Sequence, residues 1–315
     1  MASQLSSGDL LADRRYRYAA ACLEERDYTG AADLAEQALE IAPAYAPAWL
    51  LLGRAREGLA AAGGGADLGA AAARAYACAL DIDPDDTLGV RADLLRLGLG
   101  DGVPALSPSY VRALFDGYAP RFERHLLEGL GYIGPELVRA AVPPVPERFA
   151  VALDLGCGTG LMGAAIRDRV AHLVGVDLSP GMLAKARAKS WRSRPLYDRL
   201  VAGELTAFLT GEPRASADLC LAADVMIYVA DLRPPLAAVA RVLRPGALAA
   251  FTVQSHAGTG AALGSDGRYA HADDHVAAAA SDGGLEILTL RPAEVRREAG
   301  RPVPGCVVVL RRTAA

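Results

Sequence analysis

The chain has 315 residues, of which 52% are hydrophobic and 22% are charged, and its formal net charge is −4 at pH 7. A chain of this length forms one large domain or two ordinary ones, with enough apolar residues for a sizeable core. The lack of a basic excess argues against non-specific binding of nucleic acid, because such binding depends on neutralising phosphates.

Cysteine spacing and hydropathy exclude further classes of protein. The five cysteines are too far apart for a paired metal-ligand motif and have no histidine cluster beside them, so we expect neither a disulfide framework nor a metal site. They are Cys22, Cys78, Cys157, Cys220 and Cys306. No N-terminal segment resembles a signal peptide, and no stretch of about 20 apolar residues lacks charge. We therefore predict a cytoplasmic protein that makes no use of a membrane.

Residues 1–100 have the spacing of helical repeats. Small residues lie where antiparallel helices cross closely, and proline ends a helix because it lacks the backbone N–H. The first set is Ala19, Ala31, Ala38 and Pro43, and the second is Gly53, Ala72, Ala79 and Pro84. The two sets are offset by 34 residues, the tetratricopeptide period, if the second set carries an insertion of seven residues within 61–69. Two repeats are fewer than the roughly three that a stable stack needs. We expect the array to lean on the second half or on another chain, and to bind a protein or peptide or to self-associate.

Residues 101–148 are predicted to be a linker followed by lid-like helices. The stretch 98–109 is rich in Gly, Pro and Ser, which is typical of a linker. Helical periodicity then runs through 110–142, with breaks at Pro120 and at Gly134–Pro135. The segment PPVP at 143–146 separates these helices from the third region, 149–315.

Residues 149–315 have an α/β pattern. Apolar strands alternate with helical stretches, which predicts a parallel sheet covered on both faces. We expect seven strands, at 149–155, 172–178, 199–204, 217–224, 247–254, 285–290 and 305–312. The last two, joined by a polar loop, should form an antiparallel hairpin with EVRREAGR as its solvated tip; a basic binding edge of Arg296, Arg297 and Arg301 is the alternative. The predicted fold is a seven-stranded, doubly wound, Rossmann-like sheet after an all-α repeat domain.

The loop after the first of these strands matches two patterns. Asp154, Gly156, Gly158 and Gly160 form D-x-G-x-G-x-G, while Gly158, Gly160 and Gly163 form G-x-G-x-x-G. The first is typical of sites for S-adenosylmethionine (SAM) and the second of dinucleotide sites. A carboxylate at Asp154 would repel a pyrophosphate but would attract the ammonium and sulfonium of SAM. The sequence therefore favours SAM.

Four motifs, LDLGCGTG, GVDLSPGML, VAGEL and LRPG, resemble those of the class I SAM-dependent methyltransferases between Tyr110 and Arg312. With its repeats, the chain resembles a bacterial group of methyltransferases that carry tetratricopeptide repeats. The resemblance implies SAM as cofactor and in-line methyl transfer to an unidentified small-molecule, peptide or carrier-bound acceptor, with release of S-adenosylhomocysteine (SAH).

The resemblance also implies the cofactor residues. Asp154, Gly156, Gly158 and Gly160 would line the methionine part, and Asp177 would bind the ribose. Leu178 and Met182 would flank the adenine, and Glu204 and Leu205 would contact the edge of its ring. Ala222 would lie beneath the sulfonium, and Tyr118 or Phe122 would cover the sulfonium by a cation–π contact. Cys157 is counted among the cofactor-binding residues because it belongs to the same loop. Although a helix N-terminus lowers a thiol pKa, methyl transfer needs no enzyme nucleophile, so we expect Cys157 to pack the loop.

Catalytic and substrate residues are predicted at the same edge of the sheet. His271 is the candidate general base, although a capping or surface role is favoured for it. Tyr228 is a candidate catalytic residue, and a core aromatic is its equal alternative. Tyr132, Arg268 and Tyr269 are candidate substrate residues.

Two other functions stay open at the sequence level. One is a non-catalytic SAM-binding adaptor whose repeats bind a protein. The other, less favoured, is an NAD(P)-dependent oxidoreductase, which would place a pyrophosphate beside Asp154.

Overall fold

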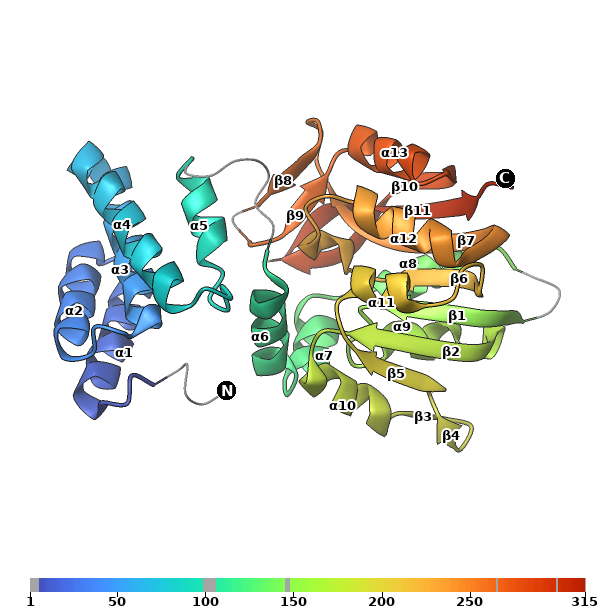
Figure 1. Cartoon of the computed structure of the whole chain (residues 1–315), viewed down its shortest axis with the longest axis horizontal. Coiled ribbons are helices and arrows are strands. Elements are labelled where there is room, and N and C mark those ends of the chain that lie inside the picture. The colour runs from blue at the N-terminus through green and yellow to red at the C-terminus, as the bar shows by residue number, and fades with distance from the viewer. Residues whose placement is uncertain (1–5, 99–105, 145–147, 265, 299, 315) are drawn as a thin grey trace. The chain divides into compact units, whose positions relative to one another are not determined.

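The computed structural model describes residues 6–98, 106–144, 148–264, 266–298 and 300–314. The chain divides into two compact units, Met1–Tyr110 and Val111–Ala315, which are described separately below (Figure 1). Most of the stretch expected to be a linker, 98–109, lies outside the described residues.

All regular structure in the described residues of the first unit is helical. Consecutive helices pack on each other; they are α1 (Leu10–Glu24), α2 (Tyr28–Ile41), α3 (Ala46–Leu59), the π-helical turn η1 (Ala60–Gly64), α4 (Ala66–Ile82) and α5 (Val90–Arg96). The five alanines predicted at helix crossings are fully buried. A Cβ on Gly53 would stand 2.3 Å from the Tyr76 ring. The tetratricopeptide assignment itself stays a prediction.

The second unit is built on a nine-stranded sheet with the order β10-β11-β7-β6-β1-β2-β5, to which β8 and β9 are added beside β7. The inner pairs are parallel, whereas β11 is antiparallel to both β7 and β10. The strands are β1 (Phe149–Leu155), β2 (Val170–Asp177), β5 (Arg199–Ala202), β6 (Ala217–Ala222), β7 (Leu243–Ser255), β8 (Ala261–Leu263), β9 (Tyr269–His271), β10 (Leu285–Glu298) and β11 (Arg301–Arg312). The mixed α/β, Rossmann-like fold with a central parallel sheet is confirmed.

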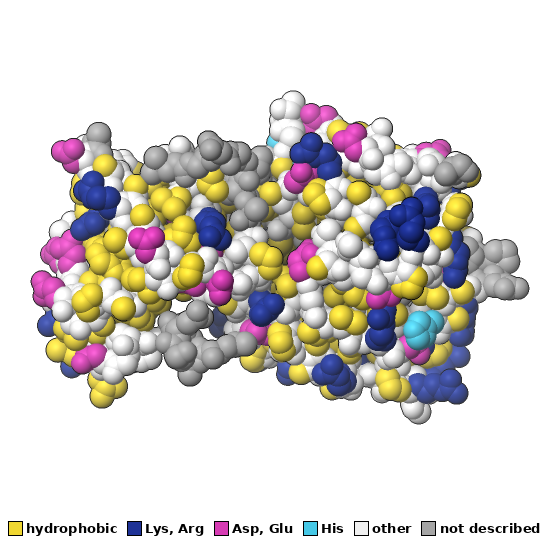
Figure 2. All heavy atoms as spheres, viewed as in Figure 1, with side chains coloured by type: hydrophobic (Ala, Val, Ile, Leu, Met, Phe, Trp, Pro, Cys, Tyr) yellow, Lys and Arg dark blue, Asp and Glu magenta, His cyan; other side chains and the backbone are white. Residues whose placement is uncertain are grey.

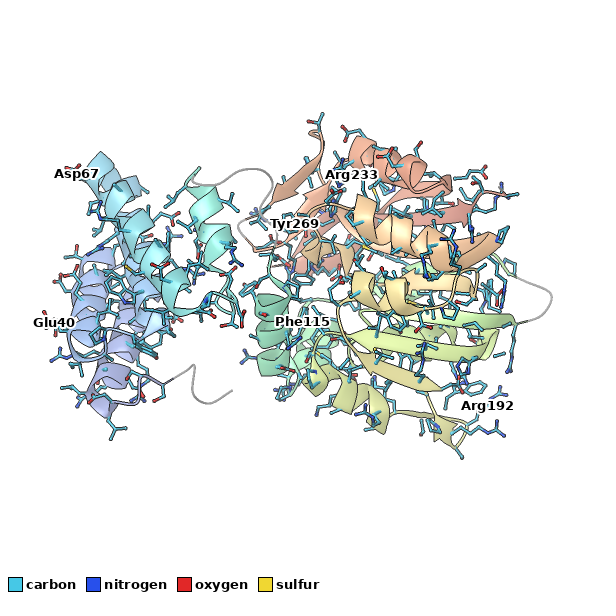
Figure 3. The ribbon with its side chains drawn as sticks, viewed as in Figure 1. Glu40, Asp67, Phe115, Arg192, Arg233 and Tyr269 are labelled. Atoms are coloured by element: carbon cyan, nitrogen blue, oxygen red, sulfur yellow. The ribbon has the colours of Figure 1, made fainter. Side chains whose placement is uncertain are left out.

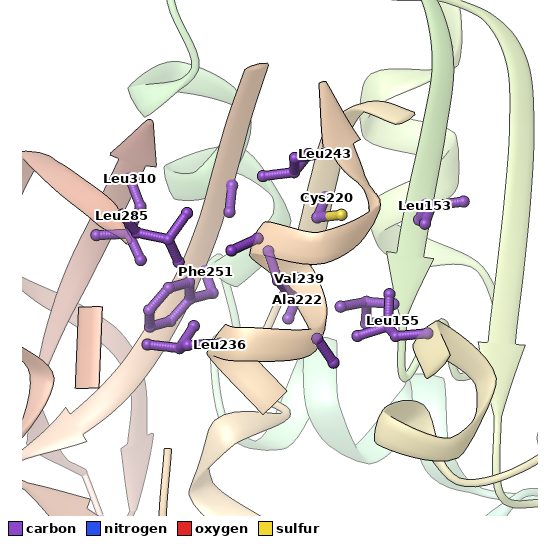
Figure 4. Close-up of a cluster of buried hydrophobic side chains, with 14 of the residues drawn as sticks. Leu153, Leu155, Cys220, Ala222, Leu236, Val239, Leu243, Phe251, Leu285 and Leu310 are labelled. Atoms are coloured by element: carbon purple, nitrogen blue, oxygen red, sulfur yellow. The ribbon is translucent and has the colours of Figure 1, made fainter. Parts of the chain in front are cut away.

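Helices cover both faces of this sheet and bury a separate core on each. One core includes residues of α8 (Gly134–Ala141), α9 (Leu161–Ile166) and α10 (Pro180–Ala188), and the other includes residues of α11 (Leu205–Gly211), α12 (Arg233–Val242) and α13 (Asp273–Asp282). Strand β1 serves both, because alternate side chains point to opposite faces: Leu153 and Leu155 enter the second core and Ala152 the first. Figure 4 shows the second core.

Short helices precede the sheet in the second unit. Helix α6 (Pro108–Tyr118) is followed by α7 (Phe122–Arg124), the π-helical η2 (His125–Gly129) and α8. Strand β2 points toward α6 and α7 (Figure 1). The end of η2 is tied to β10, because Arg297 N donates to Leu130 O (2.8 Å) and Ile133 N donates to Val295 O (3.0 Å). These helices therefore lie at the carboxyl edge of the sheet.

Two sequence predictions about the C-terminal part were wrong. The segment predicted as a polar loop, 291–304, mostly continues β10 and β11, and Arg296, placed in a solvated tip, is 1% exposed. The segment around Tyr269 and His271, predicted as a loop, contains β9, which pairs with β7 and β8. Both side chains are fully buried because they share the inner side of that short strand.

On the face drawn in Figure 2, basic and acidic side chains of the second unit are interspersed among apolar ones. The five cysteines are free thiols. Within the described ranges, no helix is long and apolar enough to cross a bilayer, and no group of three potential metal ligands is found.

Candidate functional site

The glycine loop lies between β1 and α9 and has the backbone shape that its sequence demands. Gly156, Gly158 and Gly160 have φ values of 64°, 53° and 94°, a region that glycine enters without steric cost. A Cβ on Gly156 would meet Val225 at 2.6 Å. Gly163 has no such φ and instead lies under Tyr197, whose hydroxyl would be 2.3 Å from its Cβ. The loop thus follows the first glycine pattern, and Gly163 is a packing residue.

Asp177, at the end of β2, holds this loop by its backbone. Its Oδ2 accepts from Gly158 N (2.8 Å) and its Oδ1 from Ser179 N (2.8 Å). Burial raises the pKa of this carboxyl, and the two N–H donors act in the opposite direction. The predicted ribose-binding acid is therefore oriented by the glycine loop itself.

Asp154 lies beneath the loop and is 1% exposed. Its Oδ2 accepts from the Tyr197 hydroxyl (2.6 Å), whereas its Oδ1 has no hydrogen-bond partner in the described part of the chain. The pKa of Asp154 is raised to about 7, because the upward effects of burial and of the nearby Asp177 outweigh the lowering by the Tyr197 hydrogen bond. Asp154 was predicted to line the methionine part of the cofactor; its burial makes its influence there electrostatic.

Cys157 packs the loop. It is 4% exposed, its N–H donates to Val176 O (2.9 Å), and burial raises the pKa of its thiol well above the ordinary value. A protonated, enclosed thiol is inert. The structure supports a packing role for Cys157.

Aromatic side chains of the lid helices lie over the glycine loop. Phe115, on α6 (Figure 3), meets Tyr228 edge-on at 5.2 Å. Phe122 lies between Phe115 (6.1 Å) and Tyr118 (5.3 Å), and its ring is 3.9 Å from where a Cβ of Gly158 would be. The Tyr118 hydroxyl is hydrogen-bonded to His125 Nδ1. The predicted cover residues are thus brought to the loop.

The residues predicted around the adenine differ in accessibility. Leu178 and Leu205 are half-buried just after β2 and β5, whereas Met182 and Ala222 are almost fully buried, Ala222 as part of the second core. Glu204 caps α11, because its two oxygens accept from Thr206 N (2.8 Å) and Ala207 N (2.7 Å). Its carboxylate is therefore oriented by its own helix, and its adenine contact stays a prediction.

A buried ion-pair network, not foreseen from the sequence, lies at the ends of β6 and β7. Arg296 Nη1 donates to both oxygens of Asp224 (2.9 and 3.1 Å), Nη2 donates to Gln254 Oε1 (2.8 Å), and Nε donates to Glu298 Oε1 (3.0 Å). Asp224 has a φ of 60°, which is unusual for a non-glycine residue. Its N–H donates to Thr252 Oγ1 (2.8 Å). Strand β10 is thus fastened to the carboxyl edge through a charged side chain.

Three predicted substrate or catalytic residues border this network. Arg268 pairs with Glu298, and its Nε is 3.5 Å from the Tyr228 hydroxyl. Burial raises the pKa of Tyr228 and of Tyr132. Tyr132 is 6% exposed, and Asp224 and Asp154 both act on its pKa. The structure therefore brings Tyr228, Arg268 and Tyr132 to one region.

Comparison with known proteins identifies the domain. Residues 153–251 match the family model described as "Methyltransferase domain". The chain contains a class I SAM-dependent methyltransferase domain. The chain is 31% identical over 152 residues to a malonyl-[acyl-carrier protein] O-methyltransferase from Enterobacter lignolyticus, a match covering 48% of this chain and 55% of that protein. It is 30% identical over 167 residues to human methyltransferase-like protein 27, covering 51% and 64%.

Structural comparison agrees on the fold. The [4+2]-cyclase SpnF superposes with a TM-score of 0.55 at 18% identity, covering 68% of this chain and all of that one. The chain spans less than two thirds of the length of the relatives named above. A shared methyltransferase-like fold leaves the reaction to be argued from the site.

The methyltransferase domain has features that fit a cationic nucleoside cofactor. Positive φ at three glycines lets a ligand approach the backbone closely. Three carboxylates, Asp116, Asp154 and Asp177, lie near each other, since Asp177 acts on the pKa of Asp154 and Asp116 on that of Asp177. Asp154 Oδ1 and Asp116 Oδ2 are buried without a partner in the described part of the chain. Clustered carboxylates of this kind favour a ligand with positive charge, such as SAM.

His271 does not have the surroundings of a general base. It is fully buried on β9, its Nε2 lies 3.1 Å from Met226 O, and its ring stacks on His275. Burial lowers its pKa to about 4. Tyr269 beside it is also fully buried. These two positions were predicted from a loop, and the pairing of β9 removes them from the solvent-facing edge.

Sequence reasoning missed four residues of this region, namely Asp116, Tyr197, Asp224 as an ion-pair partner, and Glu298. Tyr197 comes from the segment before β5, 43 residues after Asp154, and no local pattern links the two. Asp116 does lie next to Phe115 and two residues before Tyr118, in the segment LFDGYA. A polar residue amid lid aromatics was the available signal.

Proposed function

We propose that this protein transfers the methyl group of SAM to an acceptor oxygen and releases SAH, and that Asp177 binds the ribose. The observation that carries the proposal is the glycine loop with Asp177 hydrogen-bonded to Gly158 N at the carboxyl edge of a methyltransferase sheet. The position after the second strand is where Rossmann-like folds present an acid to ribose hydroxyls. Bound SAM would supply an electrophilic methyl group.

The side chains of the domain supply position and exclusion of water. The glycine loop and Asp177 would fix the cofactor, while the rings of Phe115, Tyr118 and Phe122 would shield the reacting atoms. Holding nucleophile and methyl carbon in line provides the main acceleration in such a displacement. The acceptor would then lie against Tyr228, Arg268 and Tyr132, on the far side of the lid aromatics.

The acceptor oxygen in this proposal is already ionised, as in a carboxylate. Neither predicted catalytic residue suits a base at neutral pH, because His271 is buried behind Met226 O and Tyr228 has a raised pKa. A carboxylate has an ordinary pKa near 4 and needs no base. The guanidinium of Arg268 provides a cation beside Tyr228. Several relatives are named O-methyltransferases, including ubiquinone biosynthesis O-methyltransferases.

The helical unit would serve delivery of the acceptor. We propose that it belongs to the tetratricopeptide class and binds a protein or peptide, including a carrier that holds the acceptor, or a second copy of the chain. The buried alanines at its helix crossings support this class.

The test is SAH release by the full chain with SAM and panels of short acyl carboxylates, phenols and amines. We expect release with carboxylates, detection of methyl esters, and a loss of at least tenfold in kcat/KM for Arg268→Met, about 1.4 kcal/mol. The exposed Arg311→Met, whose partner Glu286 is also exposed, is the matched control. Release with amines alone would contradict the oxygen acceptor. SAM binding without turnover, with every panel and with a cell extract, would favour the alternative of a non-catalytic SAM-binding adaptor.

A further inference from the structure

Helix α6 of the lid is fastened to the cofactor-binding edge by one carboxylate. Asp116 Oδ1 accepts from the Ser179 hydroxyl (2.6 Å) and from Gly181 N (3.0 Å). Both donors lie at the first turn of α10, which follows Asp177 directly in the chain. Ser179 is fully buried. The contact therefore joins segments 63 residues apart, inside the protein.

These bonds continue into the glycine loop. Ser179 N donates to Asp177 Oδ1 (2.8 Å), and Asp177 Oδ2 accepts from Gly158 N (2.8 Å). A continuous chain thus runs from the lid through Ser179 and Asp177 to the loop. Hydrogen-bonded groups that share donors in this way shift together, because moving one member changes the geometry of the next.

The helix α10 does not need Asp116 for its own capping. Ser179 already serves as the N-cap, since its Oγ accepts from Met182 N (3.0 Å). Asp116 instead uses the hydroxyl proton of Ser179 and a further N–H of the first turn. A second observation shows that the close approach is specific: a Cβ on Gly181 would be 3.2 Å from both Asp116 Oδ1 and Ala119 Cβ. The glycine makes room for the lid.

The charge of Asp116 has a cost that a cationic ligand offsets. Asp116 raises the pKa of Asp177, which means that the two carboxylates repel each other. Asp116 Oδ2 is buried and has no partner in the described part of the chain. The docked lid therefore places a second negative charge beside the ribose-binding acid, and one of its two oxygens has no partner in the described residues.

We propose that Asp116 is a positioning residue that couples docking of the lid to cofactor binding. A ligand held by Asp177 orders Ser179 for Asp116, and the positive charge of SAM relieves the repulsion between the two carboxylates. The proposal rests on the proposed function in one respect, that SAM and SAH are the ligands. Reciprocity requires that, if bound cofactor favours docking of the lid by some factor, the docked lid favours cofactor binding by the same factor.

The test combines calorimetry and hydrogen exchange on the full chain with SAH and SAM. For Asp116→Ala we expect a Kd for SAH raised about tenfold, within the usual range of coupling. We also expect ligand-induced protection of residues 111–129 to be lost. Asp116→Asn keeps an oxygen that can accept from Ser179 and Gly181, so this variant should retain SAH affinity and SAH-induced protection. Its affinity for SAM relative to SAH should fall, because SAM carries the extra positive charge.

A second lid variant separates coupling from simple loosening. Leu126 of η2 is 7% exposed and packs with Tyr132 and Val295, off the chain of bonds from Asp116 to the loop. Leu126→Ala should speed exchange of the free lid yet keep the SAH-induced protection. The coupling is overturned if Asp116→Ala lowers only the melting temperature, or if Leu126→Ala loses the protection equally. Failure of the wild-type protein to bind SAH or SAM would overturn the proposed function as well, whereas unchanged variants beside a binding wild type would overturn the coupling alone.

Discussion

Asp154 is held in an unfavourable state that its neighbour Tyr197 partly relieves. The carboxyl is buried with one oxygen bonded to the Tyr197 hydroxyl, and burial raises its pKa to about 7. An unfolded Asp has a pKa near 3.9. Between these values the folded protein binds the extra proton, so the contribution of Asp154 to stability falls as the pH rises from about 4 to about 7.

Tyr197→Phe should therefore destabilise the protein in a pH-dependent way. Removing the donor to a buried carboxylate costs about 1–3 kcal/mol, and it raises the pKa of Asp154 further. The deficit should be largest above pH 7, where Asp154 is ionised, and smaller at pH 5. Urea unfolding of both proteins at pH 5 and pH 8 measures it, with the exposed Tyr18→Phe as control. Equal deficits at the two pH values would contradict this account of Asp154.

The charge at Asp154 was predictable but its surroundings were not. An acid directly before the first glycine is visible in the sequence, and so are the glycines with positive φ. The Tyr197 hydroxyl and the Arg296 network depend on segments that meet only in the folded sheet. His271 was misplaced for the same reason, because three residues of β9 give no periodicity to detect.

At the scale of elements, the long β10–β11 hairpin is anchored through Arg296. This side chain is 1% exposed and pairs with Asp224, Gln254 and Glu298. Arg296→Met should destabilise the second unit by about 3–5 kcal/mol, because it leaves Asp224 as a buried charge without its partner. The adjacent Arg297→Met should cost less than about 1 kcal/mol, since Arg297 and its partner Glu294 are exposed. Chemical denaturation measures both.

A compensating variant checks the reason for that loss. Asp224→Asn added to Arg296→Met removes the stranded charge and should recover part of the stability. A double variant less stable than Arg296→Met, or equal losses for Arg296 and Arg297, would show that the ion pair is not the anchor.

The sequence could predict the elements better than their ends. The order of strands and helices after residue 149 follows from the apolar runs of the sequence. The burial of the small residues in the helical unit follows from their repeat spacing. The extension of β10 was missed because the segment EVRRE is polar. Its burial depends on Asp224 and Gln254, which lie on or after other strands, so no window of local sequence contains the cause.

At the scale of the whole molecule, the two compact units should respond separately to ligand and mutation. Gly53 lies against the buried Tyr76, whose hydroxyl is held by Glu57 at 2.7 Å. Gly53→Ala should therefore lower the free energy of unfolding of the helical unit by about 1–3 kcal/mol, because the added methyl group overpacks this contact. In the control Gly69→Ala the new methyl group enters open space, so this variant should raise the free energy of unfolding by about 0.5–1 kcal/mol. In scanning calorimetry, SAH should shift only the transition of the second unit. A single transition that is shifted by Gly53→Ala, by Gly69→Ala and by SAH would contradict separate units.

The most direct test of the account is calorimetric titration of the full chain with SAM, beside Asp177→Ala and the exposed Asp282→Asn. We predict binding to one site, a Kd raised at least tenfold (about 1.4 kcal/mol) by Asp177→Ala, no change with Asp282→Asn, and no binding of NADH. Binding of SAM that is unaffected by Asp177→Ala, or binding of NADH in its place, would contradict the assignment of the glycine loop and Asp177 as the cofactor site.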